Sequence, residues 1–246
     1  MTQLLASVLD TREAETVIQA GADIVDLKNP HSGALGALPI ERIECIVQQV
    51  AGRRPVSATI GDLPPDPLRL TDAILRTAAS GVNYVKVGFF SNHNLHDCLR
   101  SMAGITAKQA LVAVLFADRQ PPLQRLSDFA AAGFRGIMLD TADKQRGQLL
   151  GHIGPAELER FVTDARGLGL FSGLAGSLRL QDIPRLLHLR PDYLGFRGAL
   201  CQRRDRVEAV IPHQVLAIRH AVSGHPAPSG SAEAELLEPC PHDRYL

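Results

Sequence analysis

Lysine is scarce in this sequence, which has 22 arginines but only four lysines, Lys28, Lys86, Lys108 and Lys144. Arginine stays protonated in proteins, whereas a lysine amine can lose its proton and then act as a nucleophile or a base. A chain that otherwise uses arginine for positive charge is expected to keep lysine where an amine is needed. The alternative is chance placement on the surface, and the position of each lysine decides between the two.

Three of the four lysines fall at or just after the carboxyl ends of short apolar runs that are predicted to be β-strands. The second run ends with Asp26 and Lys28, the fourth contains Lys86, and the sixth ends at Asp140, with Lys144 soon after. Asp26 and Lys28 are two residues apart, so on a strand their side chains point the same way. Only Lys108, on a predicted helix-to-strand connection, has the position of an ordinary solvated lysine.

Such a group of amines and carboxylates is suited to carbonyl chemistry. Ammonium groups held close together disfavour one another's charge, and burial adds to this effect. A neutral amine can attack an aldehyde or ketone to form a Schiff base, and the resulting enamine can attack a second carbonyl. Nearby Asp and Lys side chains would donate and accept the protons. The sequence therefore predicts aldolase-type catalysis without a metal or cofactor, by Lys28, Lys86, Asp26, Asp140 and Lys144.

The strand-end aspartates also have a structural interpretation. Buried Asp–Lys pairs can be purely structural, and an Asp at the end of a strand can cap the helix that follows. For Asp10 and Asp62, which follow the first and third apolar runs, we expect this structural role.

The elements that position these residues alternate regularly. Eight short apolar runs are separated by longer amphipathic stretches, several of which begin with helix N-terminal signals such as Asp10-Thr11 and Gly154-Pro155. This pattern predicts an α/β fold, a closed (β/α)₈ TIM barrel in one domain over residues 1–221. A doubly wound open sheet is the alternative, weakened because the first strand–helix turn lacks a G-x-G-x-x-G motif. The predicted strands are Leu4–Leu9, Asp23–Lys28, Val56–Ile60, Tyr84–Phe89, Leu111–Ala117, Gly136–Asp140, Phe171–Ala175 and Tyr193–Arg197. The predicted helices are Thr11–Ala20, Pro39–Ala51, Leu68–Ser80, Asn92–Ala103, Leu123–Ala132, Pro155–Gly167, Gln181–Leu187 and Asp205–Ala221.

The segments after the seventh and eighth runs suggest a phosphate site. They contain Gly176-Ser177 and Arg197-Gly198, at the place where β/α barrels commonly bind phosphate through backbone N–H groups. Arg197 is expected to add a charge-assisted contact. Ordinary glycine turns and a surface arginine are the alternative interpretation. Together with the lysines, these segments predict a small phosphorylated carbonyl substrate.

Composition argues against some classes of partner and indicates the cellular compartment. Lys+Arg and Asp+Glu are both 26, which argues against a nucleic-acid or polybasic membrane surface. The four cysteines contain no C-x-x-C pair, which fits a reducing compartment and argues against a zinc cluster. The N-terminus does not resemble a signal peptide, and no apolar run is long enough to span a bilayer. We expect a cytoplasmic protein and a homo-oligomer, with residues 222–246, rich in Pro, Gly and Ser, as a flexible tail.

From about Leu4 to Ala221 the chain resembles the (5-formylfuran-3-yl)methyl phosphate synthase family, also called 4-(hydroxymethyl)-2-furancarboxaldehyde-phosphate synthases, of methanofuran biosynthesis. The segments that carry this resemblance include Ala20–Pro30 followed by Gly33–Ala37, Val56–Asp62, Tyr84–Gly88, Met138–Ala142, Leu174–Ser177 and Phe196–Ala199.

The resemblance implies a lyase that condenses two molecules of glyceraldehyde 3-phosphate, with loss of phosphate and water. It implies a Schiff base on Lys28, proton transfer by Lys86, and active-site roles for Asp26, Asp140 and Lys144. Two features depart from the pattern: an arginine-rich segment over residues 201–206 and the C-terminal extension.

Three other functions remain open at this stage. The first is a class I aldolase or isomerase that acts on another phosphosugar and yields a linear product. The second is a barrel that binds a phosphometabolite without catalysis, which would leave the lysines unexplained. The third is a cation-dependent enolisation by the aspartates, which a chelator would inhibit.

Overall fold

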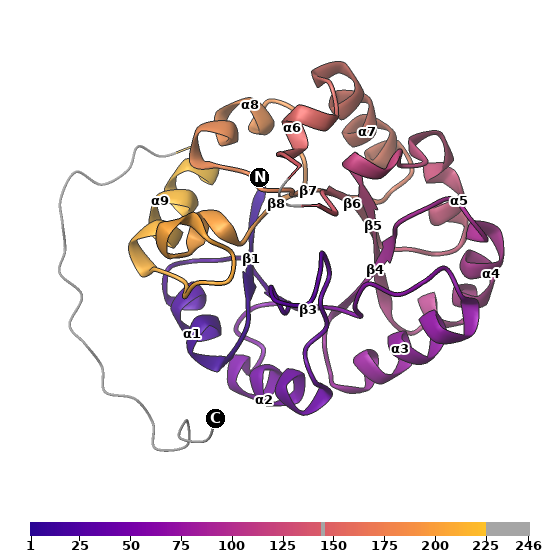
Figure 1. Cartoon of the computed structure of the whole chain (residues 1–246), viewed down its shortest axis with the longest axis horizontal. Helices are drawn as coiled ribbons and strands as arrows, with labels where there is room; N and C mark the ends of the chain where they lie inside the picture. Colours follow the sequence, from indigo (N-terminus) through magenta and orange to yellow (C-terminus); the bar gives the residue numbers. More distant parts are fainter. Residues whose placement is uncertain (144–145, 225–246) are drawn as a thin grey trace.

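The computed structural model shows eight parallel strands closed into a barrel and surrounded by helices (Figure 1). It describes residues 1–143 and 146–224. The strands pair in chain order, and β1 closes the ring by pairing with β8, where Gln3 lies opposite Tyr193. The predicted (β/α)₈ barrel is confirmed, and the open doubly wound sheet is wrong. The strands are β1 (Gln3–Val8), β2 (Ile24–Leu27), β3 (Val56–Thr59), β4 (Tyr84–Phe89), β5 (Ala110–Phe116), β6 (Gly136–Asp140), β7 (Phe171–Leu174) and β8 (Tyr193–Phe196).

The helices follow the strands in the expected alternation. They are α1 (Thr11–Gln19), α2 (Ile40–Val50), α3 (Pro67–Ala79), α4 (Leu95–Thr106), α5 (Leu126–Ala131), α6 (Leu149–His152), α7 (Pro155–Gly167), α8 (Ile183–Leu187) and α9 (Pro212–Val222), with 3₁₀ turns at Ala117–Arg119, Leu123–Arg125, Leu180–Asp182, Gly198–Leu200 and Gln202–Arg204. Among the described helices, none has the length and apolar character needed to cross a bilayer.

Most predicted helix boundaries differ from the structure by up to three residues, and two differences are larger. The last helix begins at Pro212 rather than at Asp205, because residues 201–210 form a separate closed loop in which Cys201 and Val210 pair in antiparallel fashion. The short helix α6 was not predicted, since its four residues are too few to show helical periodicity. The predicted tail lies outside the described residues from position 225 onward.

The apolar core has two parts, as expected for a barrel. The larger part lies between the sheet and the helices, and a smaller cluster that includes Leu5, Val114 and Met138 fills the barrel interior. Gly173 makes room there, because a Cβ at that position would lie 2.2 Å from the ring of Tyr193. Burial of this ring raises the pKa of the Tyr193 hydroxyl above its usual range. The packed interior leaves the carboxyl ends of the strands as the place for a site.

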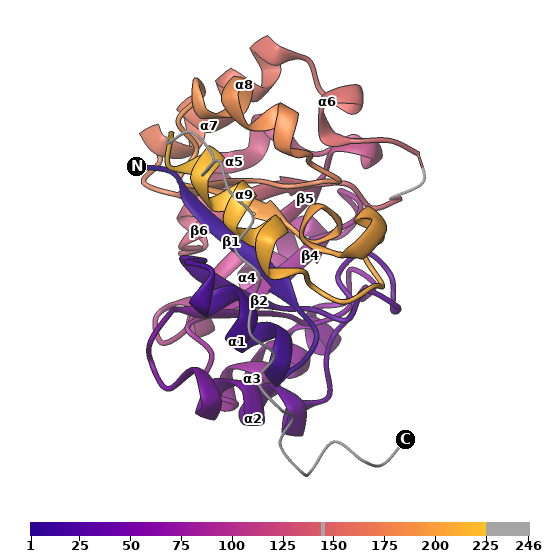
Figure 2. The same cartoon turned by 90° about the vertical axis from the view of Figure 1, so that its left-hand side faces the viewer.

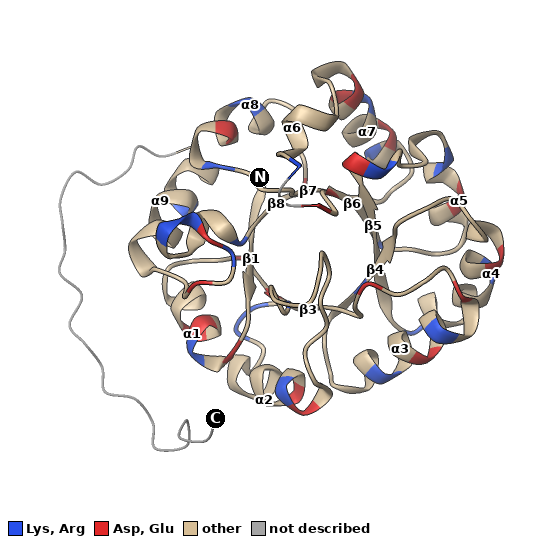
Figure 3. Cartoon of the chain, viewed as in Figure 1, with Lys and Arg blue, Asp and Glu red and all other residues tan. Residues whose placement is uncertain are grey.

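The segments that follow the strands gather at one end of the barrel, here called the mouth (Figure 2). Basic and acidic residues both occur along the surrounding helices (Figure 3).

Candidate active site

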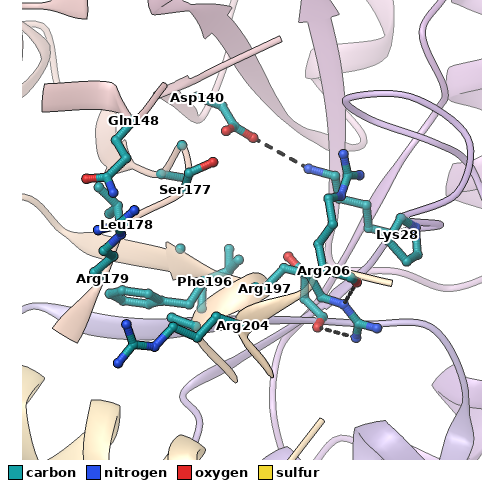
Figure 4. A pocket seen from close by; sticks show the side chains of 18 of the residues that line it. Lys28, Asp140, Gln148, Ser177, Leu178, Arg179, Phe196, Arg197, Arg204 and Arg206 are labelled. Atoms are coloured by element: carbon teal, nitrogen blue, oxygen red, sulfur yellow. Dashed lines mark hydrogen bonds and ion pairs between the residues drawn. The ribbon is translucent and has the colours of Figure 1, made fainter. Parts of the chain in front are cut away.

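Lys28 and Asp140 face each other across the mouth. β2 and β6 lie opposite each other in the closed strand order, and the Lys28 Nζ is 3.5 Å from the Asp140 Oδ2 (Figure 4). The second carboxylate oxygen of Asp140 accepts a hydrogen bond from the backbone N–H of Thr141 at 2.7 Å, which fixes the carboxylate plane. Lys28 is 8% exposed and Asp140 is 4% exposed. An amine and a carboxylate are thus held together at a nearly dry position that opens onto the mouth.

A second ion pair involves Lys86 on β4 and Asp26 on β2. The Lys86 Nζ lies 3.0 Å from the Asp26 Oδ1, and both side chains are buried. Ser7 donates to Asp26 Oδ2 at 2.8 Å and Ser57 donates to Oδ1 at 2.6 Å. These serines flank Asp26 in register on β1 and β3. Three donors thus hold the Asp26 carboxylate and position the amine beside it.

Both pairs line one cavity of about 1410 Å³. Typical small-molecule sites occupy roughly 300–1,000 Å³, so this cavity can hold more than one small substrate. The sequence predicted that Asp26 and Lys28 point the same way and that the amines lie close together. The structure places both amines in the lining of this cavity and pairs each with a carboxylate. Each carboxylate is therefore placed to exchange a proton with its amine, the role expected of aspartates beside the lysines.

Lys144 lies outside the described residues, but the chain before it is tightly held. Asp118, after β5, accepts hydrogen bonds from the backbone N–H groups of Ala142 at 2.7 Å and Asp143 at 2.9 Å. Burial of Asp118 opposes its ionisation, but these backbone donors outweigh that effect and hold the pKa of the carboxyl below its usual range. An ionised Asp118 therefore anchors the chain that leaves β6 beside Asp140.

The loops after β7 and β8 present unused backbone donors to the cavity. Among the described residues, the N–H groups of Gly176, Ser177 and Leu178 donate to no protein acceptor, and neither do those of Gly198 and Ala199. Gly176 (φ 109°) and Ser177 (φ 53°) both have positive φ, which bends the chain as it leaves β7. These residues line the cavity, so the predicted phosphate position has the donors that such a site needs.

Arg197 has a different role from the one predicted. All five N–H groups of its guanidinium donate to protein acceptors: both carboxylate oxygens of Glu13 and the backbone oxygens of Ser7, Arg206 and Glu208. The predicted contact of this side chain with phosphate therefore lacks a free donor. Arg197 instead ties the end of β8 to α1, and it was misjudged because the sequence does not reveal its buried partner Glu13.

The two aspartates with expected structural roles have them. Asp10 caps α1 by accepting from the N–H of Glu13 at 2.8 Å. Asp62 accepts from the N–H groups of Ala34 at 2.8 Å and Leu35 at 2.6 Å, and so holds the loop that follows β2. That loop carries Leu35 into the barrel interior beneath the mouth.

Sequence reasoning missed several residues that line the site. Ser7 and Ser57 had a usable signal, because each is a polar residue within an otherwise apolar run. Arg206 had none beyond the arginine-rich composition of its segment. In the described part of the chain, no three His, Cys, Asp or Glu side chains are grouped so that they could hold a metal ion.

Comparison with known proteins identifies close relatives. A family model described as 4-HFC-P synthase matches residues 4–219. A protein of Methylorubrum extorquens is 42% identical over 208 residues, which cover 85% of this chain and 86% of that protein; it is provisionally named (5-formylfuran-3-yl)methyl phosphate synthase. A Methanocaldococcus jannaschii protein with that name is 34% identical over 225 residues, which cover 87% of this chain and 96% of that protein.

Solved structures support the fold alone. A phosphoribosylanthranilate isomerase from Thermotoga maritima superposes with a TM-score of 0.64 at 13% identity, covering 91% of this chain and all of that chain. A 3-hexulose-6-phosphate synthase superposes with a TM-score of 0.63 at 16% identity, covering 90% of this chain and all of that chain.

Proposed function

Since this chain belongs to the 4-HFC-P synthase family, we propose that it condenses two molecules of glyceraldehyde 3-phosphate into (5-formylfuran-3-yl)methyl phosphate, in methanofuran biosynthesis, through a Schiff base on Lys28. The observation that carries the proposal is the ion pair between Lys28 and Asp140 at the mouth of a cavity large enough for two small substrates. The names of the relatives support the product. The chemistry of the amine supports the covalent step.

The proposed reaction begins with formation of the imine. One triose phosphate is isomerised to the ketone and held with its phosphate at the backbone donors of Gly176, Ser177 and Gly198. Asp140 takes a proton from Lys28, and the free amine adds to the carbonyl carbon. Water leaves as the C–O bond breaks, and the protonated imine makes the middle carbon of this substrate electrophilic.

The second stage forms the carbon–carbon bond. The second triose phosphate, still an aldehyde, loses the proton on its middle carbon and eliminates its phosphate, and the terminal carbon of the enol form that results attacks the middle carbon of the Lys28-bound imine. This bond joins a terminal carbon to a middle carbon, as the branched skeleton of the product requires. Lys86, held by Asp26, supplies or removes protons on the inner side of the cavity, and Lys144 is proposed to do so from the segment after β6. After the ring closes, elimination of the amine from the carbon that was attacked returns Lys28 and forms a ring double bond.

The remaining steps balance the atoms. Two triose phosphates contain one phosphate and two waters more than the furan product, so the sequence includes one phosphate elimination and two net dehydrations. Cyclisation yields an aromatic ring, whose stability makes the overall reaction effectively irreversible. Proton transfer at each step is the work that the four described lysine and aspartate side chains can perform.

The test combines product analysis with trapping. Incubation of the protein with glyceraldehyde 3-phosphate alone should release a furan aldehyde phosphate, detected by mass and by its ultraviolet absorbance. Borohydride should reduce the intermediate and label Lys28, and the label should disappear in Lys28→Arg. A label that persists in this variant contradicts the covalent role, and a linear sugar phosphate as product would indicate a plain aldolase. Loss of activity with a chelator would instead favour cation-dependent enolisation.

A further inference from the structure

Residues 201–210 form a closed loop over the mouth, which we call the arginine strap because it contains Arg203, Arg204 and Arg206. Its ends are joined where Gln202 N–H donates to the Ala209 oxygen at 3.0 Å. Arg203 (φ 54°) and Arg204 (φ 58°) both have left-handed backbones, which is costly for residues other than glycine. Contacts with the barrel hold the loop in this shape.

The anchor of the strap is the buried guanidinium of Arg197. It donates to the backbone oxygens of Arg206 at 2.8 Å and Glu208 at 3.1 Å, while its ion pair with Glu13 fixes it to α1. Val210 N–H donates to the same Glu13 carboxylate at 3.2 Å. The strap backbone is therefore fixed on the barrel, and the direction of the Arg206 side chain follows from it.

The Arg206 side chain extends from the strap toward the loop after β2. Its Nη2 donates to the Gly33 oxygen at 2.8 Å, and it makes no other hydrogen bond to the side chains or backbone that the structure describes. The residue is half-buried and lines the cavity on the side of Lys28, away from Ser177 and Leu178 (Figure 4). Burial lowers the pKa of this guanidinium, and the field of Asp140 opposes that effect.

The proposed reaction requires two phosphate positions, since both substrates carry a phosphate. The unused N–H groups after β7 and β8 provide one. Of the other cations that line the cavity in the described part of the chain, Lys28 and Lys86 are ion-paired and Arg197 has no donor left. Arg179 is exposed and lies beside Leu178, on the side of the first position (Figure 4). Arg119, Arg203 and Arg204 are exposed, where a phosphate contact is weakened by water and by loss of side-chain freedom.

We propose that Arg206 binds the phosphate of the second triose phosphate, the one that loses its phosphate and attacks the Lys28-bound imine, and so determines that the second substrate is phosphorylated. The guanidinium is already ordered, so a bidentate contact costs little entropy. The two phosphates would then lie on either side of the Lys28–Asp140 pair, with the reacting carbons between them. This inference rests on the proposed function for the identity of the substrate but not for the presence of the anion site.

The anion site can be tested without catalysis. Phenylglyoxal modifies arginine, and glycerol 3-phosphate carries the phosphate of the substrate but no carbonyl to form an imine. Peptide mass spectrometry should show that saturating glycerol 3-phosphate slows modification of Arg206, while glycerol does not, and that Arg160, exposed on α7, is unaffected. Equal modification of Arg206 with and without glycerol 3-phosphate would overturn the proposal, whatever reaction the protein catalyses.

Kinetics then separate binding of the second substrate from activation of Lys28. Arg206→Gln should raise the half-saturating concentration for furan formation about 10- to 100-fold, the loss typical of a charge-assisted contact. Borohydride trapping on Lys28 should stay within about threefold of wild type, because imine formation needs only the first substrate. The half-saturating concentration of Arg206→Lys should lie between those of wild type and Arg206→Gln. Lysine keeps the positive charge but lacks the planar guanidinium that can contact two phosphate oxygens at once. Arg160→Gln should match wild type.

Two results would contradict this role for Arg206. If trapping and furan formation fall by the same factor in Arg206→Gln, the residue acts on Lys28 and not on the second phosphate. If neither falls, the second phosphate is bound elsewhere. The thermal unfolding temperatures of both Arg206 variants show whether the substitution has instead destabilised the arginine strap. Failure of wild type to form an imine or a furan would refute the proposed function and leave the protection experiment as an independent test of the anion site.

Discussion

Lys28 and Asp140 are 112 positions apart in the sequence, yet their charged atoms lie 3.5 Å apart across the barrel mouth. The pair is nearly buried, so its charges are poorly screened by water. The geometry gives the Lys28 amine a proton acceptor at the position where a substrate carbonyl would enter.

The first prediction concerns this acceptor. Asp140→Asn keeps the shape of the side chain, and its amide oxygen can still accept from the Thr141 N–H, but it cannot take the proton of Lys28. The rate of imine formation should fall about 10²- to 10⁴-fold, the range for loss of general acid–base catalysis. Adding borohydride at a series of short reaction times and measuring the labelled Lys28 gives this rate. Trapping at the wild-type rate would mean that another group removes the proton.

The sequence predicted the elements around this pair because two simple patterns were intact. The strands of a parallel barrel are buried on both faces, and β5 is indeed one apolar run from Ala110 to Phe116. The period of two along a strand was enough to place Asp26 and Lys28 on one side. The scarcity of lysine then separated amines at the mouth from the lysine on a surface turn.

The remaining features depend on contacts between distant segments. The pairing of Arg197 with Glu13 joins residues 184 positions apart, and no local pattern indicates it. The start of α9 at Pro212 was missed because residues 205–211 can form a helix as easily as a loop until the Arg197 anchor is known. The side of the mouth reached by Arg206 follows from that same anchor.

The inner pair gives a prediction about stability. Lys86→Met leaves the Asp26 carboxylate buried with only Ser7 and Ser57 as donors, so the free energy of unfolding should fall by about 3–5 kcal/mol. Asp26→Asn should also destabilise, but the double variant should lose clearly less than the sum, because neither charge is then left alone. Urea unfolding of the four proteins measures the coupling. Strictly additive losses would show that the two side chains do not stabilise each other.

A third prediction distinguishes the anchor from a phosphate ligand. Arg197→Met leaves Glu13 buried without its partner, so the free energy of unfolding should fall by about 3–5 kcal/mol. Glu13→Gln should destabilise as well, although Glu13 is not among the residues that line the cavity. A direct phosphate ligand would behave differently, since its loss would raise KM and leave stability almost unchanged. Unfolding curves and KM values for both variants decide between these roles.

The last prediction concerns how the first phosphate is held. Ser177 has a left-handed backbone (φ 53°) and an exposed side chain beside the unused N–H groups. If the backbone binds the phosphate, Ser177→Gly keeps the ligand, relieves strain of about 1 kcal/mol, and should leave kcat/KM within about twofold of wild type. If the hydroxyl is the ligand, the same substitution removes a charge-assisted hydrogen bond and should raise KM by about tenfold or more. Gly176→Ala provides the matched contrast, because a Cβ there would lie 3.1 Å from the Thr141 nitrogen on a backbone with φ of 109°. That strain should distort the turn, so binding should weaken in Gly176→Ala even though no polar side-chain group is removed.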